Sequence, residues 1–201
     1  DTPGTSGKTH KTYTYAQIQD LIDGAHEALK EKGVAKGDRV MIAAPNSARL
    51  FATILAVWRL GAVAIPVDIR ITAAELQNIA KRLKAKILGG SGRNVPGFMS
   101  QHASLESDGI SIVDISAFPE KARSESAIGY GDAIDLEAPA FIILTSGTTG
   151  VPKGAVHNLG SFMINIVDIG NMAGVGKEER GLLPLPLSHI FGLGVTLVCF
   201  A

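Results

Sequence analysis

Between Tyr15 and Lys32 an apolar residue recurs at every third or fourth position. This spacing is typical of an amphipathic helix that packs one face against a core. The apolar positions are Ile18, Leu21, Ile22, Ala25, Ala28 and Leu29. Gly33 follows at once, where glycine commonly supplies the left-handed residue that ends a helix. The pattern therefore predicts a helix over residues 15–32.

The next part of the chain alternates short continuous apolar runs with a helical segment. Runs 39–44 and 62–67 are uninterrupted, which predicts strands buried on both faces. Residues 47–60 between them have helical periodicity, with Asn46 or Ser47 as the N-terminal cap. This order predicts two parallel strands joined by a helical crossover.

The same pattern continues once more along the chain. Thr72 is a suitable cap for a helix that runs to Leu83, and residues 86–88 form a third short apolar run. The resulting βαβαβ order predicts an α/β fold, with a mainly parallel sheet and flanking helices.

Residues 89–108 are rich in glycine, serine and other polar residues, so we expect a surface loop with little regular structure. A strand is predicted at 110–115, and the charged stretch 119–135 is expected to be an irregular connection. The apolar run 190–201 is shorter than the roughly 20 residues of a membrane span, so it predicts a core helix or strand. Because the chain lacks an initial methionine and stops within this run, we expect a piece of a longer protein.

The strand predicted at 140–144 leads directly into Thr-Ser-Gly-Thr-Thr-Gly-Val-Pro-Lys-Gly, residues 145–154. The glycines allow a turn with inward-pointing N–H groups, the hydroxyls add donors, and Lys153 adds a positive charge. This combination suits a polyphosphate. It is not a Walker A loop, because the glycines are spaced differently and a proline precedes the lysine. A surface turn rich in glycine and threonine is the alternative.

This segment resembles the signature loop of the adenylate-forming superfamily, which includes acyl-CoA synthetases, aryl-CoA ligases, luciferases and peptide-synthetase adenylation domains. In that family the loop holds the β- and γ-phosphates of ATP while a carboxylate attacks the α-phosphorus. Pyrophosphate leaves and an acyl-adenylate forms. The resemblance implies a catalytic role for Lys153 and ties Thr145 to the magnesium site. The implied ATP-binding residues are Thr145, Ser146, Gly147, Thr148, Thr149, Gly150 and Lys153.

The resemblance covers nearly the whole chain. The matching flanking segments are 12–18, 37–40, 45–47 and 61–68. We expect them to be scaffold, with Asp38 capping or bracing a loop. His157 matches a family histidine, and a solvent-facing or capping role is expected for it. Leu144 and Leu159 stand where the family often has tyrosine and a second histidine.

His189 lies in an apolar segment shaped by prolines, residues 183–193. A core histidine bonded to a backbone carbonyl is the structural explanation. The segment also resembles the aromatic-histidine segment of acyl- and aryl-CoA ligases, where the histidine orients the acyl carboxylate. This implies a catalytic role for His189 and a fatty or aromatic acid rather than an amino acid. Ser188 replaces the more usual Phe or Tyr in the pocket wall.

The amino-acid composition limits the classes of partner that this chain can bind. The chain has 201 residues, of which 46% are hydrophobic, so it can bury a core. Its 19 basic and 19 acidic residues leave no net charge to attract nucleic acid, and the expected partner is a small molecule. Cys199 has no second cysteine for an internal disulfide, which fits a reducing compartment and equally fits a secreted protein without disulfides. We expect a cytoplasmic location.

We therefore interpret residues 1–201 as an incomplete N-terminal AMP-binding domain. Residues 1–135 are its βαβ scaffold, and residues 136–201 carry the phosphate loop and the start of the acyl pocket. The resemblance implies an acid–thiol ligase that uses ATP, Mg²⁺ and coenzyme A. The alternatives are an adenylation domain that loads a carrier protein, and a nucleotide-binding fragment without catalysis. The isolated chain is expected to be inactive and to self-associate through its truncated edge.

Overall fold

The computed structural model describes residues 11–91, 95–121, 134–145, 152–174 and 181–200. The strands are β1 (Arg39–Ala43), β2 (Val63–Val67), β3 (Ile87–Gly90), β4 (Ser111–Asp114), β5 (Pro139–Thr145) and β6 (Lys153–Asn158). The helices are α1 (Tyr15–Glu31), α2 (Ala48–Arg59), α3 (Ala73–Arg82), α4 (Val95–His102), α5 (Leu159–Ala173) and α6 (Ile190–Phe200), with 3₁₀ helices η1 (Ala103–Asp108) and η2 (Ile115–Ala117).

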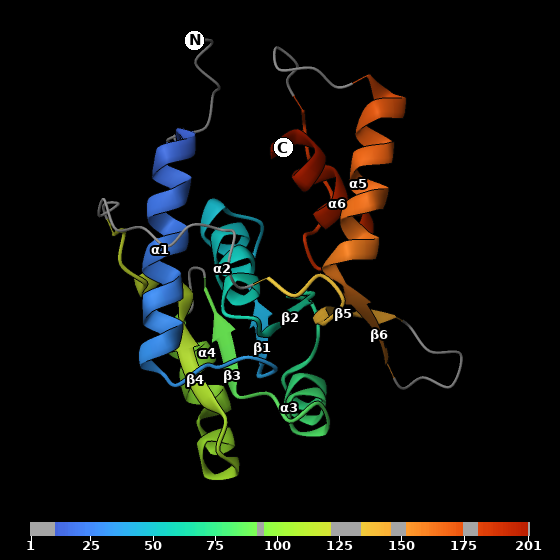
Figure 1. The fold of residues 1–201 in the computed structure, drawn as a ribbon. Helices are drawn as coiled ribbons and strands as arrows, with labels where there is room; N and C mark the ends of the chain where they lie inside the picture. The colour runs from blue at the N-terminus through green and yellow to red at the C-terminus, as the bar shows by residue number, and fades with distance from the viewer. Residues whose placement is uncertain (1–10, 92–94, 122–133, 146–151, 175–180, 201) are drawn as a thin grey trace, which may run out of the picture.

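These strands form one six-stranded sheet in the order β4-β3-β1-β2-β5-β6 (Figure 1). All neighbours are parallel except β5 and β6, which are antiparallel. The predicted α/β class with a mainly parallel sheet is therefore confirmed. The chain moves from β1 to β2 and then returns across β1 to β3, so the direction of winding reverses next to β2.

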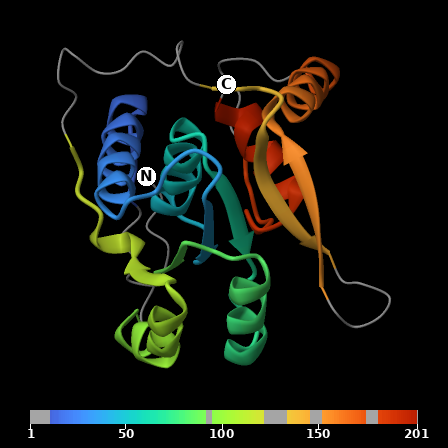
Figure 2. The same ribbon diagram turned by 60° about the horizontal axis from the view of Figure 1, so that its bottom comes forward.

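Helices cover both faces of the sheet (Figures 1 and 2). In β1, Val40 and Ile42 point to the face covered by α1, α2, α5 and α6. Met41 and Ala43 point to the opposite face, which α3, α4 and η1 cover. This two-sided burial explains why the predicted strands appear as continuous apolar runs rather than as alternating patterns.

The helix ends follow the predicted capping chemistry. Ser47 is the N-cap of α2, and its side chain accepts a hydrogen bond from Leu50 N at 3.1 Å. Thr72 caps α3 and forms a capping box with Glu75. Gly33 follows α1 with φ +76°, a left-handed conformation that suits glycine. These local signals explain why the ends of α1, α2 and α3 could be predicted from the sequence.

Asp38 braces the turn before β1, as predicted. Its Oδ2 atom accepts a hydrogen bond from Ala35 N at 2.9 Å and lies 3.2 Å from Lys86 Nζ.

The prediction of a surface loop over residues 89–108 is wrong. Strand β3 continues to Gly90, and α4 and η1 occupy 95–102 and 103–108. The few apolar residues here carry the packing, since Leu105 is fully buried and Phe98 packs on the same core cluster. The polar residues between them hid this pattern. The irregular connection predicted at 119–135 lies largely outside the described residues.

The apolar run near the end of the chain forms helix α6, which decides between the predicted helix and strand. Figure 1 shows α6 beside α5, a helix that the sequence patterns did not reveal. Among the described residues, no helix combines the length and the apolar character that crossing a membrane requires.

Candidate functional site

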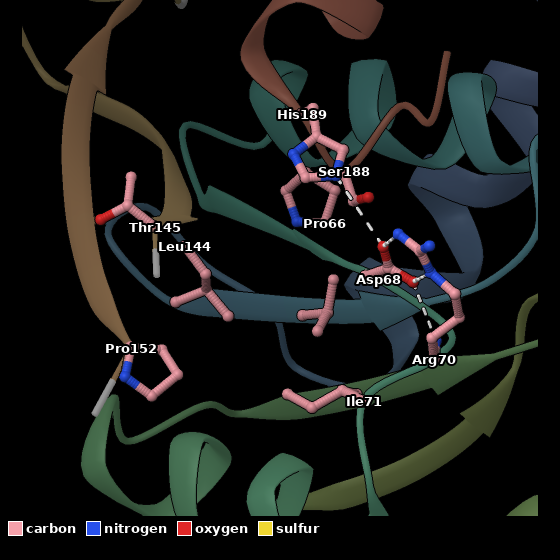
Figure 3. Close-up of a pocket in the computed structure, with 10 residues that line it drawn as sticks. Pro66, Asp68, Arg70, Ile71, Leu144, Thr145, Pro152, Ser188 and His189 are labelled. Carbon is pink, nitrogen blue, oxygen red and sulfur yellow. Dashed lines mark hydrogen bonds and ion pairs between the residues drawn. The ribbon is translucent and has the colours of Figure 1, made fainter. Parts of the chain in front are cut away.

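A pocket opens at the carboxyl ends of β2 and β5, which are parallel neighbours. In open α/β sheets, ligands bind at this edge, near the point where the winding reverses. The pocket has a volume of about 440 Å³. Its apolar wall consists of Pro66, Val67, Ile71, Leu144 and Pro152, and its polar lining consists of Asp68, Arg70, Thr145, Ser188 and His189 (Figure 3).

The two ends of the candidate phosphate loop are held together beside this pocket. Thr145 ends β5 and is paired with Lys153 at the start of β6. The Thr145 hydroxyl donates to Lys153 O at 3.3 Å, and Arg82 Nη2 of α3 donates to Pro152 O at 2.5 Å. Thr145 lines the pocket, whereas the exposed Lys153 is not among its lining residues. The predicted residues Ser146, Gly147, Thr148, Thr149 and Gly150 lie outside the described residues.

The segment before His189 is fixed by the loop after β1. Asn46 Nδ2 donates to Leu185 O at 2.7 Å, and Asn46 Oδ1 accepts from Leu187 N at 2.9 Å. His189 N donates to Pro186 O at 3.1 Å, and His189 O accepts from Leu193 N in the first turn of α6 at 3.0 Å. This turn places the side chain of His189 at the rim of the pocket.

His189 is not a core residue. Its side chain is 53% exposed, so the core-histidine interpretation is wrong. The apolar neighbours in its sequence, such as Leu187 and Leu193, are buried instead. The turn separates the ring from these neighbours, which apolar composition alone did not predict.

Asp68 and Arg70 form the charged side of the pocket. Arg70 donates from its backbone N and from Nε to Asp68 Oδ1, both at 2.9 Å, and from Nη2 to Oδ2 at 2.5 Å. These bonds, with the Arg70 side chain the largest cause, lower the pKa of Asp68 to about 2. His189 Nε2 lies 3.8 Å from Asp68 Oδ2. Asp68 is therefore a carboxylate at neutral pH.

Residues 61–68, expected to be scaffold alone, also form part of the pocket. Pro66, Val67 and Asp68 line it. Asp68 follows the last residue of a buried parallel strand, and this position was the available signal. No sequence pattern indicated Arg70, because it belongs to the site through its hydrogen bonds with Asp68.

His157 is neither a solvent-facing nor a capping residue. Its ring is half-buried and stacks on Phe141, with centroids 4.9 Å apart and an interplanar angle of 12°. The cap of α5 is Asn158, which accepts a hydrogen bond from Ser161 N at 2.8 Å. Leu159, where the family often has a histidine, is buried in the core.

The described residues contain no group of three or more His, Cys, Asp or Glu side chains that could hold a metal ion. Magnesium that arrives with a nucleotide uses phosphate oxygens and water for most of its coordination. The role of Thr145 at magnesium thus stays a prediction.

Comparison with known proteins identifies the family. The model of the AMP-binding enzyme family matches residues 3–201, so the chain belongs to this family. It is 32% identical over 196 residues to the long-chain-fatty-acid–CoA ligase FadD13 of Mycobacterium tuberculosis, covering 92% of this chain and 39% of that protein. The chain thus spans about two-fifths of this relative. It is also 32% identical over 171 residues to the hybrid PKS-NRPS synthetase xenE of Xenoacremonium sinensis, covering 85% of this chain and 4% of that protein.

The fold also matches a solved structure. The o-succinylbenzoate CoA synthetase MenE of Bacillus subtilis, in complex with its acyl-adenylate intermediate, superposes with a TM-score of 0.77 at 23% identity. The match covers 94% of this chain and 48% of that one. The same enzyme in complex with ATP and magnesium ion gives a TM-score of 0.73 at 22% identity. At this level of identity the match concerns the fold.

Proposed function

We propose that the protein containing this chain uses ATP to convert a carboxylic acid into an acyl-adenylate and then transfers the acyl group to coenzyme A. One observation carries the proposal: Thr145, the first residue of the candidate phosphate loop, lines the same pocket as His189. Apolar residues at the ends of both strands, Val67 of β2 and Leu144 of β5, line the same pocket. Phosphate, carboxylate and hydrocarbon can thus meet at one place.

Each part of the substrate has a candidate partner. The apolar wall suits the hydrocarbon of a fatty or aromatic acid, and His189 at the rim suits its carboxylate. Thr145, the loop residues through Gly150 and Lys153 are assigned to the phosphates, and Thr145 also to magnesium. Holding the triphosphate and the acid in one geometry supplies much of the rate of such reactions.

A second candidate is an adenylation domain that loads a carrier protein. The similarity to a hybrid PKS-NRPS synthetase supports this second candidate. The two functions share the first half-reaction and differ in the thiol acceptor. Measuring acyl transfer from the adenylate to coenzyme A and to a phosphopantetheinyl carrier protein separates them. We place the protein in the cytoplasm, where ATP and coenzyme A are available.

The phosphate assignment is tested with Lys153→Ala in the full-length protein. Acid-dependent exchange between pyrophosphate and ATP should fall by about tenfold to a hundredfold, the range for losing a charge-assisted hydrogen bond of about 1.5–3 kcal/mol. Stability should not change, because an exposed lysine adds little to packing. Lys36→Ala is the matched control, since Lys36 is also exposed and pairs with Asp135 away from the pocket. An unchanged exchange rate in Lys153→Ala would refute the assignment.

The acid assignment is tested with His189→Ala. The KM for the acid should rise more than the KM for ATP, because the ring is assigned to the carboxylate and not to the triphosphate. An equal rise for both substrates would contradict this role.

The 201-residue chain by itself is proposed to be inactive. The described pocket offers one wall of a site that must hold ribose, phosphates, magnesium and acid together, and a displacement of about 1 Å can cost on the order of a hundredfold in rate. Incubation with ATP, magnesium, an acid and coenzyme A should yield no acyl-CoA. Product from the pure chain would overturn this part of the proposal.

A further inference from the structure

The Asp68 carboxylate has two neighbours of different chemistry, the guanidinium of Arg70 and the imidazole ring of His189. Arg70 donates to both oxygen atoms, through its backbone N and Nε to Oδ1 and through Nη2 to Oδ2. The same Oδ2 atom lies 3.8 Å from His189 Nε2. Asp68 therefore stands between a fixed cation and the imidazole ring at the pocket rim, as Figure 3 shows.

This arrangement differs from an ordinary surface ion pair. The side chain of Asp68 is 27% exposed and directly follows β2, whose backbone is paired on both sides. The side chain of Arg70 is 79% exposed, so it reaches the carboxylate from solvent. The position of Asp68 is thus set by the sheet, and Arg70 closes around it.

A bare carboxylate would be unfavourable at this place. The proposed substrates, a triphosphate and an acid, are both anions, and like charges in a shared site repel each other. Arg70 neutralises Asp68 locally. The Asp68 carboxylate can then hold a neighbouring ring without placing a net negative charge in the pocket.

We propose that Asp68 is a positioning residue for His189, holding the ring through Nε2 so that it faces the pocket, with Arg70 fixing the carboxylate. The inference rests on the proposed function, in which His189 orients the acid. At 3.8 Å the contact has the distance of an ion pair and not of a hydrogen bond, so the carboxylate acts through its charge, which favours the ring orientation that turns Nε2 towards it. Without Asp68, the half-exposed ring must be ordered when the acid binds, and this ordering weakens binding.

The test uses Asp68→Asn in the full-length protein, which keeps the size of the side chain and removes its charge. The KM for the acid should rise by about tenfold, within the range of coupling between residues in contact. The KM for ATP should change by less than about twofold on the same grounds. Asp68→Glu, which keeps the charge, should recover part of the loss.

A double-mutant cycle with His189→Ala separates positioning from general damage. If Asp68 acts through His189, Asp68→Asn adds no further rise in the acid KM to a protein that already carries His189→Ala. The matched control is Asp108→Asn, which removes a carboxylate 2.9 Å from Lys81 on another part of the surface. This control should leave both KM values unchanged. Equal effects of Asp68→Asn with and without His189 would overturn the inference.

A spectroscopic measurement makes the inference independent of the proposed reaction. In protein labelled with ¹³C at histidine Cε1, the His189 signal is identified by its loss in His189→Ala. Asp68→Asn should shift this signal, and Asp108→Asn should not. No shift would overturn the inference even if the protein makes acyl-adenylates. A shift in a protein with no acid-dependent exchange would refute the proposed function, and with it the positioning for an acid, while leaving the ring contact established.

Discussion

Helices α1 and α5 differ in how they bury their apolar faces. Leu29 of α1 is fully buried, as are most apolar residues on that face. In α5, Ile164, Val167 and Met172 are 64%, 56% and 89% exposed. The first helix belongs to the part of the chain before residue 121, and the second to the part after residue 134, which carries Thr145 and His189. The part after residue 134, called the site-bearing part below, thus leaves more of the apolar surface of its helix α5 exposed than the earlier part does for α1.

Contacts with the first part hold the site-bearing part in place. Trp58 of α2 packs against Phe141 of β5 with ring centroids 5.8 Å apart, and its indole N–H donates to Ala140 O at 2.8 Å. Asn46 binds the segment that leads to His189. The early part thus supports the later part and also lines the pocket, through Asp68 and Arg70, whereas the later part contributes Thr145 and His189.

Trp58→Ala should lower the free energy of unfolding by about 3–5 kcal/mol, because it removes a large buried ring between the two parts. Trp58→Phe should cost about 1–3 kcal/mol, since it keeps an aromatic ring but leaves Ala140 O without its donor. Urea denaturation measures both values. A loss below about 1 kcal/mol for Trp58→Ala would show that the two parts do not depend on this contact.

Leu29→Ala should cost about 2–5 kcal/mol, because it opens a cavity in the core. Met172→Ala in the 201-residue chain should stay within about 0.5 kcal/mol, because its side chain is almost entirely in solvent. The same denaturation measurement compares them. Equal decreases in the free energy of unfolding would contradict the difference in burial between the face of α1 and the face of α5.

Asn46→Ala should cost about 1–3 kcal/mol, the net value of two hydrogen bonds of about 0.5–1.5 kcal/mol each. It should also raise the acid KM, since the segment before His189 loses its anchor. Asn165→Ala is the control, because exposed Asn165 donates to Ser161 O within α5, at 2.8 Å. An acid KM that is unchanged in Asn46→Ala would show that this anchor serves stability alone.

The smallest expected effect concerns pH. Burial lowers the pKa of His102 from its usual value of 6.5. Below that pH the unfolded chain binds a proton that the folded chain does not, so the free energy of unfolding falls as pH falls from about 6.5 towards the lowered pKa. His102→Gln should make this decrease less steep. The slope should not vanish, because burial also lowers the pKa of His26. A slope unchanged in His102→Gln would contradict the burial argument.

The sequence predicted the local features that depend on neighbouring residues. Helical spacing located α1 and α2, Thr72 marked the start of α3, and continuous apolar runs located the strands of the parallel sheet. The segment around Leu105 was missed, because two buried side chains, His102 and Leu105, among many polar residues give no clear period. The strand β6 was missed as well, since its residues carry neither strong alternation nor a continuous apolar run.

The sequence by itself determined the family resemblance, the α/β class and the choice of Thr145 and His189 as site residues. These depend on residue types at fixed spacing along one segment. Only the tertiary structure decided that Thr145 and His189 line one pocket, that His189 is exposed, and that Asp68 and Arg70 join them. Asp68 and His189 are far apart in the chain, and their distance depends on how β2 and the start of α6 are placed. Long-range placement comes from packing of the whole core, which no local pattern encodes.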